Sequence, residues 1–278
     1  MTQTIDAVFQ SAYDAEVKRA YGDESLLERT VRTKTGIVGQ EVYFRKAGKG
    51  MASRLIKNAD LTAMNVDFSQ VKCPMESWGA YDYADDLDQT NINFSEAKEL
   101  GGIAGTALGL RKDQIKIDAM KNKVSQEVGN KTQKLSVEAL RAAAKILNQH
   151  GVPKQDRFFI HNAQQLDDLL GSTQTTSSEY NTVRALVNGE INTFMGFEFI
   201  CIAERKEGGL PKNTEKNATM AFAYHKSAIG FASSKEVNSS IDWIPEKQAW
   251  LVGGKFRAGA IVIDTEGLVG VWSVDTAS

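Results

Sequence analysis

The feature that most constrains the fold is a long strand-like stretch from Gly39 to Val71. Apolar side chains alternate with polar ones on both sides of the turn sequence Gly48-Lys49-Gly50, as at Val42, Phe44, Val66 and Phe68. This pattern predicts an extended hairpin with a broad, irregular tip. At about 3.3 Å per residue, arms of about ten to fifteen residues reach roughly 30–50 Å, whereas a compact domain of this length has a radius of gyration of about 19 Å. The hairpin must therefore project from the body of the protein unless another surface covers it.

The composition is that of an ordinary folded protein. Its 278 residues, of which 42% are hydrophobic and 24% charged, are enough to bury a core in one domain or in two that share a sheet. The formal net charge of -2 provides no general basic surface, which argues against tight, sequence-independent binding of nucleic acid. The two cysteines, Cys73 and Cys201, show neither metal-binding nor disulfide-framework spacing. We therefore expect a protein of a reducing compartment without a zinc site.

The sequence carries no signal for export or for a membrane. Residues 1–6 contain no basic stretch followed by an apolar run. No window approaches the roughly 20 apolar residues that a membrane-spanning helix needs. We expect neither export nor membrane insertion.

Helical periodicity is found on both sides of the predicted hairpin. Residues 5–21 form an apolar stripe that a polar arm over 23–36 follows, and a longer helical stretch covers 93–123. The interior of the longer stretch contains four glycines, each about 0.8–1 kcal/mol less favourable in a helix than alanine: Gly101, Gly102, Gly105 and Gly109. Two interpretations remain open. The stretch is either a broken pair of helices or one long helix that lets another backbone approach closely.

The second half of the chain alternates helices with strands. Ser136 caps a helix over 137–150, which Gly151 closes. The apolar run at 157–161 predicts a buried strand, and Asn162 caps the next helix. Further strand-like runs follow at 196–200, 221–231, 243–252, 258–263 and 268–274. This order predicts an α+β fold without internal repeats.

No motif in the sequence predicts a catalytic, cofactor-binding or metal site. HExxH, GxSxG, Walker A and EF-hand patterns are missing from the sequence, and the glycine-rich string at 101–105 lies inside a helical stretch instead of between a strand and a helix. The histidines His150, His161 and His225 are candidates for acid–base chemistry only as any histidine is. A run of carboxylates could bind a divalent ion through its oxygen atoms: Asp82, Asp85, Asp86 and Asp88. Such a run is more typical of a solvated turn or a helix start.

Several local strings and the order of the elements resemble one protein family. The strings are LSVEAL at 135–140, GVP at 151–153, RFFIH at 157–161, QLDDLL at 165–170, GEI at 189–191, GFEF at 196–199 and FRAGAIVID at 256–264. Together with an N-terminal arm, a projecting hairpin and a long helix, they resemble the major capsid protein of tailed phages, the Hong Kong phage-type fold. The likeness spans most of the chain. The glycine-rich centre of the long helix departs from the straight spine helix of that family.

The resemblance implies a division of the chain into five regions. These are an N-terminal arm at 1–36, an extended hairpin loop at 37–78, a spine helix with a peripheral domain at 79–134, an axial domain at 135–235, and C-terminal strands of the peripheral or axial domain at 236–278.

The resemblance also implies a function. Copies of such a protein assemble as pentamers and hexamers into an icosahedral shell, with a portal protein and with scaffold or decoration proteins as further partners. The shell encloses double-stranded DNA without sequence-specific binding, is built in the host cytoplasm and becomes part of the virion. No enzymatic activity and no cofactor are expected.

An extended hairpin with apolar side chains needs cover, because exposed edges and apolar surface promote aggregation. We expect an identical neighbouring subunit to cover Val42, Phe44, Val66 and Phe68. One alternative function is an encapsulin-type nanocompartment shell, which resembles the same fold and houses an enzyme. An alternative of another class is a cytosolic enzyme that uses His161 or His225 beside the strand at 196–202.

Overall fold

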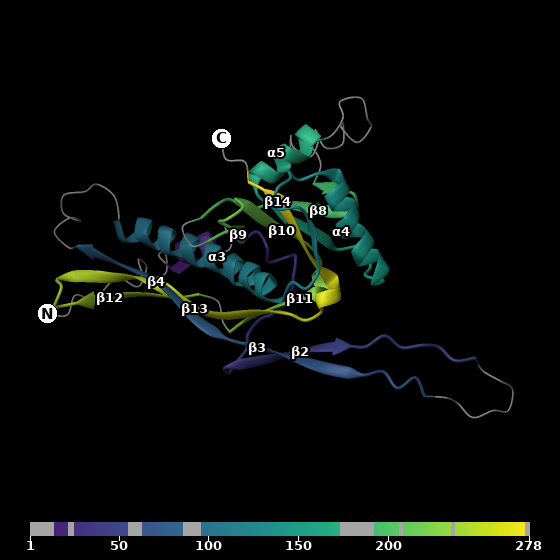
Figure 1. Ribbon diagram of the computed structural model, residues 1–278. Coiled ribbons are helices and arrows are strands. Elements are labelled where there is room, and N and C mark those ends of the chain that lie inside the picture. The colour runs from purple at the N-terminus through teal and green to yellow at the C-terminus, as the bar shows by residue number, and fades with distance from the viewer. Residues whose placement is uncertain are drawn as a thin grey trace.

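The computed structural model describes residues 14–21, 25–54, 63–85, 96–172, 192–205, 208–234 and 237–275. Two mixed sheets with helices packed on them form the body of the molecule, and a two-stranded hairpin projects from it (Figure 1). The predicted α+β class is confirmed.

One sheet, here called the β13 sheet, is organised around a strand of 14 residues. Along one edge β13 pairs with β4, and along the other edge it pairs first with β12 and then with β11. The short strand β1 extends this second edge in parallel with β11. The strands of the β13 sheet are β1 (Arg32–Lys34), β4 (Glu76–Asp85), β11 (Ile229–Ser233), β12 (Asn238–Ile244) and β13 (Ala249–Val262).

The other sheet, here called the β10 sheet, has the strand order β5-β14-β10-β6-β8-β7, and β9 pairs with the start of β10. Both faces of its centre are buried, because all eight residues of β10 and all five residues of β6 are buried. The strands are β5 (Glu127–Gly129), β6 (Arg157–His161), β7 (Thr193–Phe194), β8 (Phe197–Cys201), β9 (Lys212–Asn213), β10 (Ala218–His225) and β14 (Leu268–Val274).

Among the described elements the chain crosses between the two sheets three times: once from β4 to β5 by way of the long helix at 96–123, and twice through a short 3₁₀ helix. Of the two 3₁₀ crossings, η1 (Lys226–Ala228) joins β10 to β11, and η2 (Thr265–Gly267) joins β13 to β14. The run expected as one strand at 221–231 is therefore split between the sheets, and the run at 243–252 is split by a turn at 245–248. The breaks at 226–228 (KSA) and 245–248 (PEKQ) are short polar interruptions between apolar runs, and the pattern predicted one strand across each of them.

The helices of the second half of the chain form as their caps predict. Helix α4 (Val137–Gln149) begins after Ser136, whose Oγ accepts a hydrogen bond from the backbone N–H of Ala139 at 3.4 Å. Helix α5 (Ala163–Ser172) begins after Asn162, whose Oδ1 accepts from the backbone N–H of Gln165 at 2.8 Å. Both helices pack on one face of the β10 sheet, where they share a core with Phe159 and Phe197.

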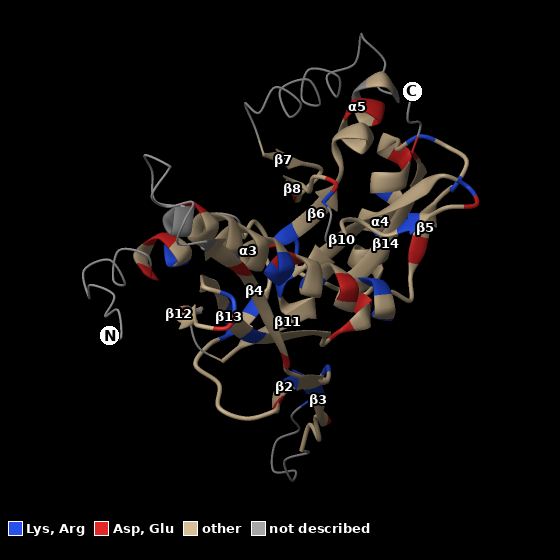
Figure 2. Cartoon of the chain, turned by 90° about the vertical axis from the view of Figure 1, so that its left-hand side faces the viewer, with Lys and Arg blue, Asp and Glu red and all other residues tan. Residues whose placement is uncertain are grey.

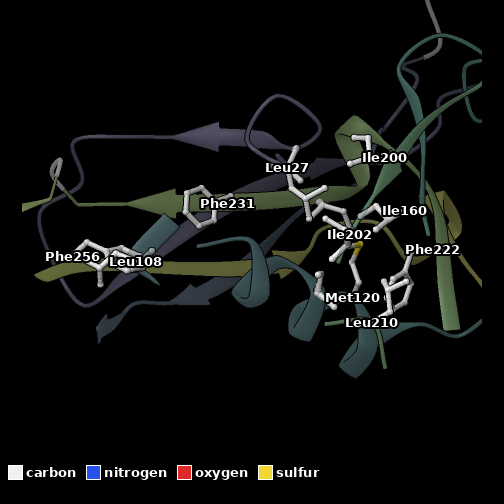
Figure 3. Close-up of a cluster of buried hydrophobic side chains, with 14 of the residues drawn as sticks. Leu27, Leu108, Met120, Ile160, Ile200, Ile202, Leu210, Phe222, Phe231 and Phe256 are labelled. Atoms are coloured by element: carbon white, nitrogen blue, oxygen red, sulfur yellow. The ribbon is translucent and has the colours of Figure 1, made fainter. Parts of the chain in front are cut away.

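The main core lies between the other face of the β10 sheet, the β13 sheet and the long helix α3 (Glu96–Lys123) (Figure 3). Buried side chains of this core that Figure 3 labels are Leu27, Leu108, Met120, Ile160, Ile200, Ile202, Leu210, Phe222, Phe231 and Phe256. Both sheets thus contribute to one continuous hydrophobic core.

The glycines of α3 were open to two interpretations, a broken pair of helices or one helix that another backbone approaches closely, and the structure shows the second. The helix is continuous, and residues 14–21, which are also helical, lie against it. A Cβ at Gly105 would lie 2.7 Å from the carbonyl oxygen of Val17 and 2.9 Å from Cβ of Ala20. The glycine therefore permits the close approach of another backbone, as the second interpretation predicted.

Candidate assembly surface

The predicted hairpin is present and is built from β2 (Glu41–Ala47) and β3 (Phe68–Pro74) in antiparallel register. Beyond these strands the arms at 48–54 and 63–67 continue away from both sheets (Figure 1). The backbone N–H of Gly48 donates to the carbonyl oxygen of Asp67 at 2.8 Å. A Cβ at Gly50 would lie 2.5 Å from Sδ of Met64, so the arms remain side by side. The expected irregular tip falls on 55–62, outside the described residues.

The inner face of the hairpin is covered by the chain itself. Val42 and Phe44 are 7% and 0% exposed, and they pack with Cys73, Met75, Ala232 and Ile263. Phe44 fits over β11 because Gly230 has no side chain: a Cβ there would lie 2.9 Å from Cζ of Phe44. We therefore correct the expectation that a neighbour covers Val42 and Phe44. Alternation indicates a covered face, but it does not indicate which molecule covers it.

Among the residues that the structure describes, none covers the opposite, outer face of the hairpin in this way. Phe68 is 74% exposed, and in the register it lies opposite Ala47, on the face that also carries Tyr43. Tyr43 is 50% exposed, and Met51 and Met64 in the arms are 85% and 58% exposed. Sequence reasoning missed these three residues, although Tyr43 alternates with Val42 and Phe44 and so had to face the other way.

The four residues expected at a subunit contact thus separate into two groups. Val42 and Phe44 belong to the root of the hairpin, whereas Val66 is partly buried and Phe68 is exposed. A contact of Val66 and Phe68 with a neighbouring subunit remains a prediction.

Two lysines near the end of β2 join the hairpin to the body. Lys46 follows Val42 and Phe44 on the inner face, and its Nζ lies 2.9 Å from Oδ1 of Asp264. Nζ of Lys49 lies 3.0 Å from Oε2 of Glu266 and donates to the carbonyl oxygen of His150 at 2.6 Å. The acceptors lie at η2 and at the end of α4, where the two sheets are joined.

A buried carboxylate fixes the N-terminal arm to α3. Asp113 accepts hydrogen bonds from the backbone N–H groups of Leu26 and Leu27, at 2.8 and 3.2 Å, and from Oγ of Ser25 at 3.0 Å. Nζ of Lys116 lies 3.1 Å from Oδ1 of Asp113, and both side chains are fully buried. Burial lowers the pKa of Lys116 from 10.5 to about 8, although the Asp113 charge opposes this shift. The arm is thereby anchored before the chain enters β1.

A second ion pair lies beside this anchor. Nζ of Lys112 is 2.5 Å from Oε2 of Glu28 and 4.7 Å from the ring centre of Tyr21. Burial raises the pKa of the Tyr21 hydroxyl, with the Glu28 charge as the next cause. Sequence reasoning missed both pairs; the available signal was a set of charged residues inside the otherwise buried half of α3.

The two histidines of the enzyme alternative are not brought together. His161 lies at the end of β6, where its Nδ1 is 2.8 Å from the carbonyl oxygen of Asn162, and burial lowers its pKa. His225 lies opposite Arg157 at the other end of β6, and its Nδ1 is 2.7 Å from Oγ of Ser227. Desolvation also lowers the pKa of His225. Each ring therefore satisfies a local backbone or hydroxyl group.

The acidic run at 82–88 differs from its expected structure. Asp82 and Asp85 belong to strand β4 instead of a turn or a helix start, while Asp86 and Asp88 lie outside the described residues. Within the described ranges, no group of three or more His, Cys, Asp or Glu side chains is placed to hold a metal ion. The described helices include none with the length and apolar character needed to cross a membrane. Basic and acidic residues are interspersed, consistent with the net charge of -2 (Figure 2).

Comparison with known proteins agrees with this architecture. A family model of phage capsid proteins matches residues 5–273. No curated protein matches the sequence. Among solved structures, the capsid of cyanophage P-SCSP1u has a TM-score of 0.71 at 12% identity, over 91% of this chain and 89% of that chain. The capsid of Helicobacter pylori bacteriophage KHP30 has a TM-score of 0.70 at 13% identity, over 91% and 90%.

A virus-like particle from Pyrococcus furiosus is also similar, with a TM-score of 0.62 at 12% identity, over 92% of this chain and 96% of that chain. At these low identities, the structural similarity establishes the shared fold. The family is established by the match of the family model over nearly the whole chain. The chain therefore belongs to the phage capsid protein family and is a major capsid protein, a subunit of a capsid shell.

Proposed function

We propose that each subunit of the shell lays the outer face of its hairpin on an adjacent, identical subunit. The supporting observation is the exposure of Phe68, Met51 and Met64 on an arm that projects from the body. Covering one such side chain contributes roughly 1.5–3 kcal/mol. Stable contacts bury about 1,600 Å² in total. Many modest contacts of this kind, repeated around pentamers and hexamers, give a durable shell while still letting a misplaced subunit leave.

The test compares two substitutions at the most exposed aromatic residue of the hairpin strands. Phe68→Asp removes the apolar side chain and adds a charge, whereas Phe68→Leu keeps an apolar side chain of similar size. We expect Phe68→Leu to assemble as the wild type does. Phe68→Asp should remain mostly unassembled in light scattering and in electron micrographs, with an unchanged urea midpoint for the free subunit. Wild-type yields of shells from Phe68→Asp would contradict the proposed contact.

We further propose that the shell encloses double-stranded DNA and forms in the host cytoplasm, with a portal protein and with scaffold or decoration proteins as partners. The near-neutral charge suits a container in which DNA must slide during packaging. Particles isolated from producing cells should contain nuclease-protected DNA. The encapsulin-type alternative, to which the similarity of the Pyrococcus furiosus particle is relevant, predicts an enclosed enzyme instead, so that protein cargo without DNA would favour it.

We infer that the chain has no catalytic role, since its family is structural. The separation of His161 and His225 at opposite ends of β6 supports this inference. If replacing both histidines with glutamine abolished an activity of the purified subunit without affecting its assembly, the inference would be wrong.

A further inference from the structure

The point that decides the direction of the projecting hairpin is the point at which the β2–β3 strand pairing ends. The β2–β3 pairing stops at Ala47 opposite Phe68, and the arms beyond it are joined through the Gly48–Asp67 hydrogen bond. The root is held by Phe44 in its core, but that core lies before this point. Two glycines, Gly48 and Gly50, follow immediately and give the chain conformational freedom. A hairpin fixed at its root alone could therefore bend at this position.

The lysine contacts to the body lie at this same position. Lys46 is the last residue of β2 whose side chain lies on the inner face, and Lys49 lies between the two glycines. Their partners Asp264 and Glu266 are more than 200 positions away in sequence. The third contact, from Lys49 to the carbonyl oxygen of His150, comes from a different element, α4. Three contacts to two elements restrain both the tilt and the rotation of the arms.

We propose that Lys46 and Lys49, with Asp264, Glu266 and the carbonyl oxygen of His150, form an electrostatic latch that sets the direction of the hairpin in the free subunit. The charged groups of the latch are these four side chains, and the one further titratable group that the described residues place against them is the His150 ring, whose Nδ1 lies 3.9 Å from Oε2 of Glu266. The paired side chains are 33–74% exposed, so salt can screen them.

Exposed ion pairs are individually weak, which makes the latch reversible. Each pair of this kind favours the closed state by up to roughly five-fold, so that two together favour it by up to roughly twenty-five-fold. An arm held in one direction loses less conformational freedom when it docks on a partner than a freely bending arm does. This consequence rests on the proposed function, in which the arm docks on a neighbouring subunit; the latch itself does not.

The latch is tested in the free, full-length subunit by measuring distances between two spin labels. Cys201, which is exposed, is replaced by serine, while Cys73 is buried and remains. Labels are attached at Met51→Cys on the arm and at Lys145→Cys on the exposed side of α4. The wild-type background should give one narrow distance distribution at about 0.05 M salt and a broad one at about 0.5 M salt. The variant Lys46→Glu/Lys49→Glu should give the broad distribution at both.

Two matched variants separate the latch from general effects of charge. Arg45→Glu/Arg54→Glu makes the same change in net charge at exposed positions of the same hairpin and should keep the narrow distribution. The exchange Lys49→Glu/Glu266→Lys should restore a narrower distribution than Lys49→Glu alone. Asp264 is left unchanged because its Oδ1 also accepts from the backbone N–H of Glu266 at 3.2 Å.

The latch is refuted if Lys46→Glu/Lys49→Glu keeps the wild-type distribution, or if the Arg45→Glu/Arg54→Glu control broadens it equally. Assembly is measured separately with unlabelled protein, as the rate at which light scattering rises. Lys46→Glu/Lys49→Glu should slow assembly by roughly five- to twenty-five-fold, and the exchange Lys49→Glu/Glu266→Lys should assemble faster than Lys49→Glu alone. The arginine control serves the distance measurement only, because Arg45 lies on the proposed docking face. If the wild type itself forms no shell, the proposed function fails, while the distance measurement still decides whether the latch exists.

Discussion

Phe44 and Phe68 belong to the same hairpin but have opposite surroundings. Phe44 is fully buried against the chain's own β11 and Ile263, and Phe68 is 74% exposed. We predict that Phe44→Ala lowers the free energy of unfolding of the free subunit by about 3–5 kcal/mol. Phe68→Ala should change it by less than about 0.5 kcal/mol. Urea unfolding of the unassembled subunit measures both values. Equal losses from the two substitutions would mean that the assignment of the two faces is wrong.

The buried Lys116–Asp113 pair makes the stability of the subunit depend on pH. The folded pKa of Lys116 is about 8, below its ordinary value of 10.5, so between these two values the unfolded chain binds more protons than the folded one. The penalty for burying the charged amine is complete below about pH 8 and is relieved as the pH rises. The contribution of this group to stability therefore increases with pH, by up to about 3 kcal/mol over the whole window.

This pH dependence can be measured against a variant that lacks the amine. Urea midpoints of the wild type and of Lys116→Met are compared between about pH 7.5 and about pH 9.5. Higher pH is avoided because burial raises the pKa values of Tyr21 and Tyr224, which would favour unfolding once the tyrosines of the unfolded chain ionise. The wild type should gain stability relative to the variant over this range. A relative loss would show that the folded pKa of Lys116 is raised instead.

At the scale of the elements, the glycines of α3 differ in purpose. A Cβ at Gly105 would meet the backbone of Val17 at 2.7 Å, whereas a Cβ at Gly102 would have no neighbour within 4 Å among the described residues. Gly102→Ala should therefore stabilise the subunit by roughly 0.5–1 kcal/mol, as expected from helix propensity. Gly105→Ala should destabilise it by roughly 1–3 kcal/mol because the packed helix at 14–21 must move. Thermal unfolding of the two variants tests this, and a stabilising Gly105→Ala would disprove the close approach.

The elements that sequence predicted correctly are those whose signals are local. Helices α4 and α5 have capping residues at Ser136 and Asn162, and β6 is a short apolar run between turns. The hairpin followed from alternation, but Gly48-Lys49-Gly50, expected as a turn, lies in the first arm, which continues to residue 54. What could not be predicted depends on distant parts of the chain: the sheet to which each C-terminal strand belongs, and the surface that covers Phe44.

The candidate site shows the same limit. Lys46 and Lys49 could be identified as charged residues of a hairpin, but their partners at η2 follow 218 and 217 positions later, respectively. The anchor at Asp113 likewise depends on backbone N–H groups 86 and 87 positions earlier. Spacing in a single sequence contains no information about such pairs, because tertiary structure alone brings them together.

At the scale of the whole molecule, the two sheets share one core. Phe222 of the β10 sheet and Phe231 and Phe256 of the β13 sheet belong to the same buried cluster (Figure 3). The crossings through η1 and η2 are also joined to each other, because the backbone N–H of Ile263 donates to the carbonyl oxygen of Ala228 at 2.7 Å. Separate unfolding of either sheet would expose to water the part of this core that the other sheet contributes.

We therefore predict that the free subunit unfolds as a single cooperative unit. Three of the four tryptophans, Trp78, Trp243 and Trp250, lie in the β13 sheet, and the fourth, Trp272, lies in β14. In a Trp272→Phe background, tryptophan fluorescence thus reports on the β13 sheet, and far-ultraviolet circular dichroism reports on the whole chain. The two urea transitions should coincide. Adding Phe222→Ala, in the other sheet, should lower the free energy of unfolding by about 3–5 kcal/mol. Both urea midpoints should therefore fall together. If fluorescence kept its midpoint while circular dichroism shifted, the sheets would be independent units, and the shared core would not hold the subunit together.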